Sequence, residues 1–114
     1  MSILVVEDEF IVRMYVADIL REDGFDVLEA GDASEAIRLL ELDNTVEVMI
    51  TDVNMPGSMD GVDLLVQVRD RWPPVKTIIT SGRDKPAVVP EGTLFFPKPI
   101  VQSTLTQAVR ALRA

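Results

Sequence analysis

The aspartate at position 52 ends a short apolar run, a pattern typical of a buried parallel strand that delivers a carboxylate to its own end. Asn54 follows two residues later, in a stretch rich in turn-forming residues. An acidic pair, Glu7 and Asp8, comes directly after a second apolar run, ILVV. Because ligands bind at the carboxyl edge of open α/β sheets, these acids are candidates for one shared site.

Three carboxylates at one edge would repel one another by about 4 kcal/mol per pair, at about 4 Å and an effective dielectric of about 20. A divalent cation would remove that repulsion. The chain has no histidine and no cysteine, so its oxygen ligands suit Mg²⁺, with Mn²⁺ also possible. One carboxylate would then be available as a nucleophile toward a phosphoryl group, while Lys98 and Thr80 offer an ammonium and a hydroxyl to the phosphoryl oxygens.

Each of these residues also has an ordinary structural explanation. Asp52 could simply end a strand and help a turn, and the acidic pair Glu7-Asp8 could stabilise a helix dipole. Thr80 could be a plain strand residue, and Lys98 a solvated one. What favours a site is that all of them fall at the ends of expected strands.

The strands that would position these residues are five apolar runs. They cover residues 3–6, 26–30, 46–51, 75–80 and 94–96. Helical patterns and short loops separate the runs, which predicts βαβ units and a parallel sheet. We therefore expect residues 1–114 to form one α/β domain, a doubly wound five-stranded parallel sheet with helices on both faces.

Helix signals vary in strength along the chain. Asp32 and Asp60 are expected N-caps. Two helices show clear apolar stripes, the first at Val12, Tyr15, Val16, Ile19 and Leu20, and the third at Leu64, Leu65, Val68 and Trp72. The slot between the fourth and fifth strands is weak, because Pro86 and Pro90 leave room for about one turn. We expect a fourth helix that is short or distorted.

Composition excludes several classes of function. The formal charge of −8 and the scattered basic residues argue against direct binding of nucleic acid. No apolar run approaches the length of a membrane span, and the N-terminus lacks the features of a signal peptide. We expect a soluble cytoplasmic protein with no membrane partner.

With these residues identified, the chain resembles the receiver domain of two-component response regulators along essentially its whole length. The motifs that carry the resemblance are Glu7-Asp8 after ILVV, Asp52 in TDVNMPGSMDG, Thr80 in IITSG and Lys98-Pro99 in FFPKP. Their order and spacing are highly specific. The implied architecture is the flavodoxin-like receiver fold.

The resemblance implies a role for each residue of the acidic edge. Asp52 would accept a phosphoryl group from a phosphohistidine on a sensor histidine kinase or a phosphotransfer protein. Asp8, Asp52 and the backbone carbonyl of Asn54 would ligate Mg²⁺, with Glu7 acting through water. Lys98 would contact the phosphoryl group.

Further implications concern the peptide bond after Lys98 and a conformational switch. The bond between Lys98 and Pro99 would be cis. After phosphoryl transfer, Thr80 would close on the phosphoryl group and Phe95, at the position of the switch aromatic, would swing inward. The protein would signal by contact with an unknown downstream protein and would not be an enzyme beyond self-phosphorylation and autodephosphorylation.

Alternative functions remain open from the sequence. We expect a stand-alone regulator, since Met1 directly precedes the first strand, but the chain could also be the receiver portion of a longer regulator or hybrid kinase. A Mg²⁺-dependent phosphatase with Asp52 as nucleophile is a second alternative, although Asn54 stands where such enzymes carry a second acid. A degenerate receiver is disfavoured because every position that the chemistry requires is filled.

Overall fold

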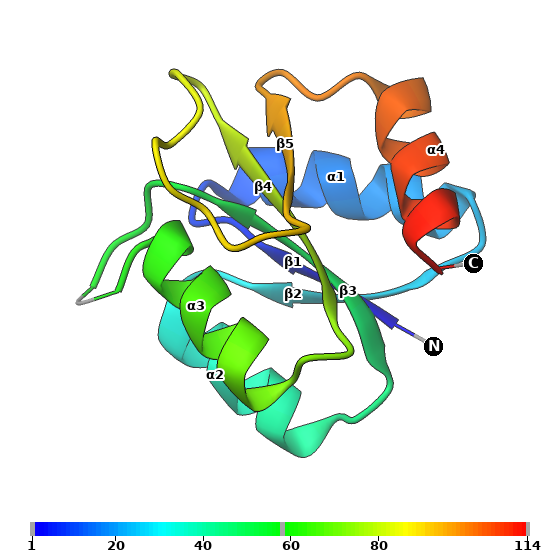
Figure 1. The fold of residues 1–114 in the computed structure, drawn as a ribbon. Coiled ribbons are helices and arrows are strands. Elements are labelled where there is room, and N and C mark those ends of the chain that lie inside the picture. The colour runs from blue at the N-terminus through cyan, green and yellow to red at the C-terminus, as the bar shows by residue number, and fades with distance from the viewer. Residues whose placement is uncertain (1, 58, 114) are drawn as a thin grey trace.

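The computed structural model describes residues 2–57 and 59–113 and contains one sheet of five parallel strands (Figure 1). Their spatial order is β2-β1-β3-β4-β5. The bounds are β1 (Ser2–Val6), β2 (Asp26–Ala30), β3 (Val46–Asp52), β4 (Lys76–Ser81) and β5 (Leu94–Pro97). All five expected strands are present within two residues of their predicted ends, so the doubly wound parallel sheet is confirmed.

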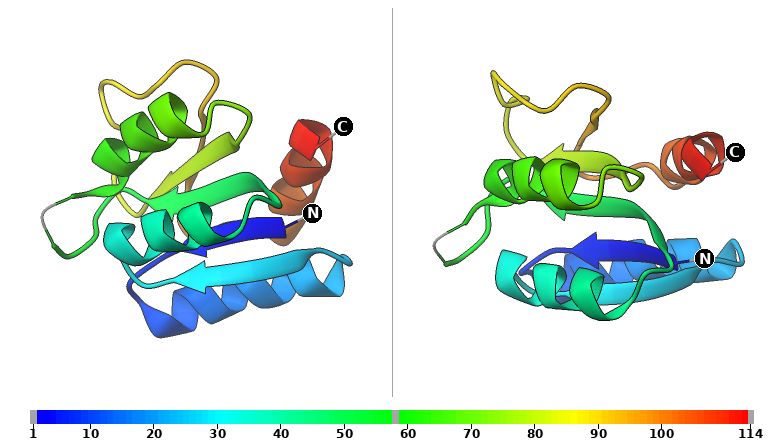
Figure 2. Two further views of the ribbon diagram at one scale, coloured as in Figure 1. Left: turned by 90° about the horizontal axis from the view of Figure 1, so that it is seen from below. Right: turned by 60° about the horizontal axis from the view of Figure 1, so that its bottom comes forward.

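Four helices cover the two faces of this sheet (Figures 1 and 2). On one face lie α1 (Phe10–Glu22) and α4 (Gln102–Arg113), and on the other lie α2 (Ala33–Leu42) and α3 (Gly61–Arg71). Each pair of helices closes its own apolar core against the sheet. The prediction of helices on both faces is confirmed.

Strand β1 shows how the sequence builds both cores at once. Ile3 and Val5 point into the core under α1 and α4, whereas Leu4 and Val6 point into the core under α2 and α3. None of the four is more than 1% exposed. Burying such a side chain is worth about 1.5–3 kcal/mol, so a central strand with no polar face is strongly held in place.

The helix ends agree with the cap signals. The Asp32 side chain accepts a hydrogen bond from the Glu35 amide at 2.8 Å, and Asp60 forms a reciprocal capping box with Asp63.

One expected core residue differs: Tyr15 is 49% exposed, because it lies at the rim of the α1 stripe and its hydroxyl donates to the Ile100 carbonyl at 3.4 Å. No helix within the described residues is both long and apolar enough to cross a membrane.

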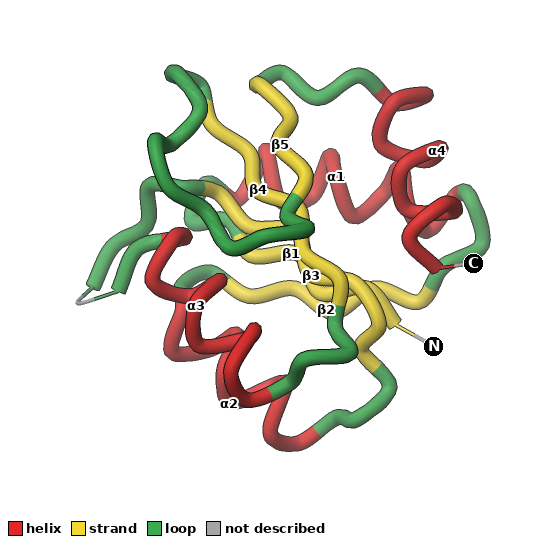
Figure 3. Tube along the Cα trace, viewed as in Figure 1, coloured by secondary structure: helices red, strands yellow, loops and turns green. Residues whose placement is uncertain are grey.

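The segment of residues 82–93 between β4 and β5 contains no helix (Figure 3). The sequence predicted a short or distorted helix of about one turn, and even that turn is absent. Pro86 and Pro90 lack the amide hydrogens that a helix needs, and their rings would clash with the preceding turn. These two prolines leave too few residues in the segment for a regular helix. Residues 2–57 and 59–113 therefore contain four helices, where five helical segments were expected.

Candidate functional site

The expected site residues come together at the carboxyl ends of the central strands. Asp52 is the last residue of β3 and lies beside Thr80 of β4 in the sheet register. Glu7 follows β1, and its amide donates to the Ala30 carbonyl at 3.0 Å. Lys98 follows β5, and its amide donates to the Ser81 carbonyl at 2.8 Å. The strand order reverses between β1 and β3, which is where open α/β sheets bind ligands.

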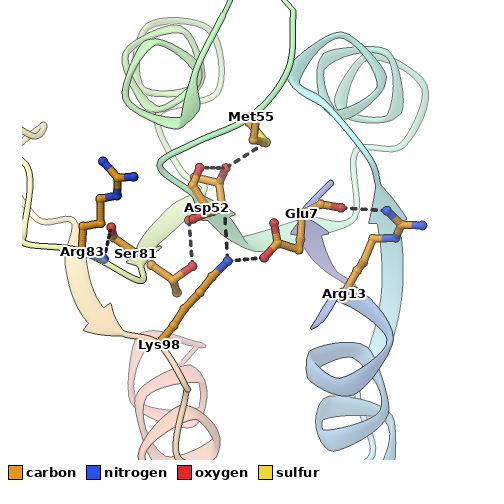
Figure 4. Close-up of polar contacts among 9 residues, drawn as sticks. Glu7, Arg13, Asp52, Met55, Ser81, Arg83 and Lys98 are labelled. Atoms are coloured by element: carbon orange, nitrogen blue, oxygen red, sulfur yellow. Dashed lines mark hydrogen bonds and ion pairs between the residues drawn. The ribbon is translucent and has the colours of Figure 1, made fainter. Parts of the chain in front are cut away.

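The Lys98 ammonium joins two of the carboxylates (Figure 4). It donates to Glu7 Oε1 and lies 3.3 Å from Asp52 Oδ2. Both carboxylate residues are buried, Glu7 at 3% exposure and Asp52 at 7%. The ammonium thus supplies the positive charge that keeps two acids together at the edge of the core.

The pKa values of Glu7 and Lys98 depend on burial and on the neighbouring charges. Burial raises the pKa of Glu7 to about 7; the nearby Asp52 adds to the increase, and the hydrogen bond from Lys98 opposes it. Burial alone would lower the pKa of Lys98. The hydrogen bond to Glu7 and the charge of Asp52 outweigh that effect, so the pKa of Lys98 is raised and the ammonium stays protonated.

The acids form a cluster that suits a hard cation. One carboxylate oxygen from each of Glu7, Asp8 and Asp52 lies within 4.8 Å of the others. Glu7 Oε2 is buried and has no hydrogen-bond partner within the described part of the chain, so it has capacity for a further donor or a hydrated ion. Carboxylates without imidazole or thiolate ligands are the donor set that Mg²⁺ prefers, and the residues present therefore fit this ion.

A cavity of about 310 Å³ opens above the cluster to solvent. It is polar, and its lining includes the exposed Asn54 that was expected to contribute a backbone carbonyl. The lining residues are Asp8, Glu9, Asp52, Asn54, Gly82, Arg83 and Lys98. The cavity is large enough to admit a phosphoryl group together with hydrating water.

The two expected switch residues, Thr80 and Phe95, do not line this cavity. Thr80 is buried, and its hydroxyl donates to the Thr51 carbonyl at 3.4 Å, so the hydroxyl points along the sheet. Phe95 is half-buried in β5 and packs against the core under α2 and α3. The peptide bond between Lys98 and Pro99 is cis, the isomer that the resemblance implies.

Two residues that support the site were not singled out from the sequence. An added methyl at Gly61 would overlap the Asp52 carbonyl oxygen, so only glycine allows α3 to begin against the end of β3. Arg13 donates to the Glu7 carbonyl at 2.7 Å and pairs with Glu29 at 3.3 Å, which fixes the backbone of the first acid. The glycine directly after the Asp60 cap was a signal that could have been used, whereas the contact of Arg13 depends on tertiary structure.

The fold and the acidic edge define a class of protein: doubly wound α/β domains with an acidic ligand site at the reversal of strand order. The family model for the response regulator receiver domain matches residues 3–110. The chain therefore belongs to the receiver domain family of two-component systems. Receiver domains are signalling domains that interact with histidine kinases or phosphotransfer proteins.

Several relatives are similar over most of this chain. The chain is 36% identical to the sensor kinase CckA of Brucella abortus, with 97% of this chain and 12% of that protein covered. It is 40% identical to the transcriptional regulatory protein PdtaR of Mycobacterium tuberculosis, with 60% of this chain and 33% of that protein covered. The chain thus spans a third or less of the length of these relatives.

Solved structures agree with the fold. The receiver domain of the hybrid histidine kinase CckA superposes with a TM-score of 0.85 at 38% identity and covers 100% of both chains. The chemotaxis protein CheY4 of Vibrio cholerae has a TM-score of 0.85 at 26% identity, with 97% of each chain covered.

Proposed function

We propose that this chain is a phospho-accepting receiver whose acceptor is Asp52. The observation that carries the proposal is the cluster of Glu7, Asp8 and Asp52 at the reversal point of the sheet, where the Lys98 ammonium pairs with Glu7 and Asp52. Asp8, Asp52 and the carbonyl of Asn54 would hold Mg²⁺, with Glu7 acting through water. When bound, the ion would neutralise the acids and the phosphoryl oxygens so that an anionic donor can approach.

The transfer step follows from the arrangement of the chain's own groups. A carboxylate oxygen of Asp52 attacks the phosphorus of a phosphohistidine; the O–P bond forms as the N–P bond breaks, and the imidazole leaves and takes a proton from water. Lys98 then turns from Asp52 Oδ2 to a phosphoryl oxygen and compensates the added charge. No group of this site needs to act as a general acid, because the imidazole is a good leaving group.

Signalling would follow from the new charge at Asp52. The Thr80 hydroxyl would release the Thr51 carbonyl, which it holds at 3.4 Å, and donate to the phosphoryl group. The space that Thr80 leaves would admit Phe95, which is half-buried in β5 opposite Ile79, the residue before Thr80. A downstream protein would then recognise the conformational change in segment 82–93 and β5. It would do so either by contact with this chain alone or within a longer regulator or hybrid kinase.

The experiment is stoichiometric labelling. The protein is incubated with acetyl phosphate and Mg²⁺, and the mass of the intact chain is followed. We expect one phosphoryl group per chain, dependent on Mg²⁺, labile to hydroxylamine and absent from Asp52→Asn. Labelling that persists in Asp52→Asn would overturn the assignment of the acceptor.

The same preparation tests the phosphatase alternative. A phosphomonoester such as p-nitrophenyl phosphate is added, and product is counted per equivalent of protein. We expect far less than one turnover over the time that labelling takes. Many turnovers per chain would favour an enzyme with an aspartate nucleophile over a phosphoacceptor.

A further inference from the structure

Arg83 is a second basic residue at the site, and it comes from the segment where this chain lacks a helix. It lines the same cavity as Asp52, Asn54 and Lys98. In Figure 4 it stands beside Ser81, on the opposite side of Asp52 from Glu7. The cavity is therefore bordered by a cation on a flank that the acidic cluster does not occupy.

The guanidinium of Arg83 is not engaged elsewhere. Within residues 2–57 and 59–113, no hydrogen bond or ion pair holds it, whereas Arg13 pairs with Glu29 and Arg71 with Glu41. The backbone amide of Arg83, by contrast, donates a hydrogen bond to Ser81 Oγ at 3.0 Å. The backbone is thus fixed at the rim of the cavity while the exposed side chain is free to turn toward it.

The charge balance of the phosphorylated site indicates a role for the free guanidinium of Arg83. Once Asp52 is phosphorylated, the site carries about two negative charges on the phosphoryl group, besides those of Asp8 and Glu7. Mg²⁺ and Lys98 together compensate three of these charges, and about one remains when Glu7 is ionised, the state that a bound Mg²⁺ favours. A guanidinium suits the remaining charge because its planar donors match phosphoryl oxygens in pairs.

We propose that Arg83 is a second cationic ligand of the phosphoryl group on Asp52, acting from the opposite flank to Glu7. The inference rests on the proposed function and adds a residue to it. Because segment 82–93 is not held in helical geometry, the residue after Gly82 can reach over the cavity. Arg83 would therefore strengthen binding of the phosphoryl group without binding the metal.

The test separates binding of the anion from binding of the metal. Beryllium fluoride, an analogue of the phosphoryl group, is titrated into the protein at saturating Mg²⁺, and backbone amide shifts are followed by NMR. We expect Arg83→Gln to weaken beryllium fluoride binding about tenfold and Arg83→Lys to weaken it about threefold. Mg²⁺ alone should bind Arg83→Gln as tightly as wild type or slightly more tightly, because a positive charge near the acids has been removed.

The matched control is Lys85→Gln, which removes the same charge from the same segment at an exposed residue that does not line the cavity. We expect it to bind beryllium fluoride within about twofold of wild type. Equal weakening in Lys85→Gln and Arg83→Gln, no weakening in Arg83→Gln, or loss of Mg²⁺ affinity together with anion affinity would each overturn the inference. If wild type itself fails to bind beryllium fluoride with Mg²⁺, the proposed function fails first.

Discussion

Glu7 and Lys98 together determine how the site behaves before any ligand binds. The ammonium satisfies Glu7 Oε1 and lies 3.3 Å from Asp52 Oδ2, while Glu7 Oε2 is left without a donor among the described residues. A buried acid that is only partly satisfied prefers to keep its proton. The site therefore couples protonation, folding and metal binding through one glutamate.

The first prediction is a pH dependence of stability that originates at Glu7. Its pKa is raised in the folded protein from 4.5 to about 7. Below about pH 4.5 the stabilising contribution of Glu7 to the unfolding free energy is fully present. This contribution decreases as the pH rises toward 7, because the folded state retains a proton that the unfolded chain has lost. The loss is about 3 kcal/mol at most. Urea denaturation in EDTA at pH 5 and pH 8 measures it.

Glu7→Gln isolates this effect from the other acids. The variant cannot ionise, so we expect its stability to exceed that of wild type at pH 8 and the difference to shrink toward pH 5. Glu47→Gln, a change at an exposed glutamate of β3, should leave the pH profile of wild type unaltered. A wild-type minus Glu7→Gln difference that is constant with pH would contradict the prediction.

At this scale the sequence predicted the acids and the lysine but not their supports. Glu7, Asp52 and Lys98 could be predicted because each follows an apolar run, and parallel strands end at one edge of a sheet. The direction of the Thr80 hydroxyl and the contact of Arg13 with the Glu7 carbonyl could not, since both depend on how separate elements pack.

At the scale of elements, the junction of α3 with the end of β3 holds the acceptor in position. A methyl group added to Gly61 would lie 2.8 Å from the Asp52 carbonyl carbon and 2.9 Å from Val53 Cα, and would overlap the carbonyl oxygen. The Gly61 amide also donates to the Val53 carbonyl at 2.8 Å. The start of the helix and the position of Asp52 therefore cannot change independently.

The second prediction is that Gly61→Ala destabilises the protein even though alanine is the better helix former. Helix propensity alone would stabilise the variant by about 1 kcal/mol. The clash with the backbone of β3 should reverse that gain and lower the unfolding free energy by about 2 kcal/mol or more. Urea denaturation measures the change, and beryllium fluoride titration should show a weakened response because Asp52 is displaced.

Gly82→Ala is the control for this substitution. Its methyl group would meet nothing within 4 Å, and Gly82 has no positive φ. We expect its unfolding free energy to stay within about 0.5 kcal/mol of wild type. If Gly61→Ala is as stable as Gly82→Ala, the tight junction does not constrain the site.

Segment 82–93 is attached to the rest of the protein by a few polar contacts. Arg69 of α3 donates to the Glu91 carbonyl, and the hydroxyls of Thr77 and Thr93 lie 3.0 Å apart. Val88 is 79% exposed, and Val89 is only partly buried where it packs against the core under α2 and α3, so apolar burial adds little to these contacts. Segments of this kind open locally at low free energy.

The third prediction follows from that weak attachment. Trypsin should cut the native protein first after Arg83, since the bond after Lys85 precedes Pro86 and resists the enzyme. Arg69→Gln removes one attachment and should speed this cleavage several-fold. Intact mass spectrometry of timed digests measures the rate.

Arg71→Gln serves as the comparison. Arg71 lies two residues further along α3 but pairs with Glu41 of α2, so its loss should not speed cleavage after Arg83. First cleavage elsewhere, or equal rates in the two variants, would contradict the role of Arg69. The two prolines allowed a weak helix to be expected from the sequence, but a full loop depends on tertiary contacts that no local pattern encodes.

At the scale of the whole molecule, the fold was predictable because the apolar pattern of the strands and the apolar pattern of the helices are consistent along the chain. Apolar runs such as residues 3–6 fill both cores, and helical stripes such as that of α3 fall on the face that the strands leave uncovered. Tyr15 shows the limit, since a stripe position at the edge of a helix can be buried or exposed depending on its neighbours. Strand order was likewise accessible only through the family resemblance.

The fourth prediction concerns the charge of the whole molecule and the acidic cluster of Glu7, Asp8 and Asp52. The chain carries a formal charge of −8, so a divalent cation is attracted from a distance. Among the described residues, the acids that converge closely enough to bind it specifically are Glu7, Asp8 and Asp52. Mg²⁺ at about 100 times its dissociation constant should raise the unfolding free energy by about 2.7 kcal/mol. Asp8→Asn should abolish most of that gain, whereas Asp70→Asn, at an exposed acid of α3, should retain it. Thermal unfolding with and without Mg²⁺ at fixed ionic strength measures all three proteins. Equal stabilisation of Asp8→Asn and wild type would mean that Mg²⁺ acts through the overall charge and that the acidic cluster is not its binding site.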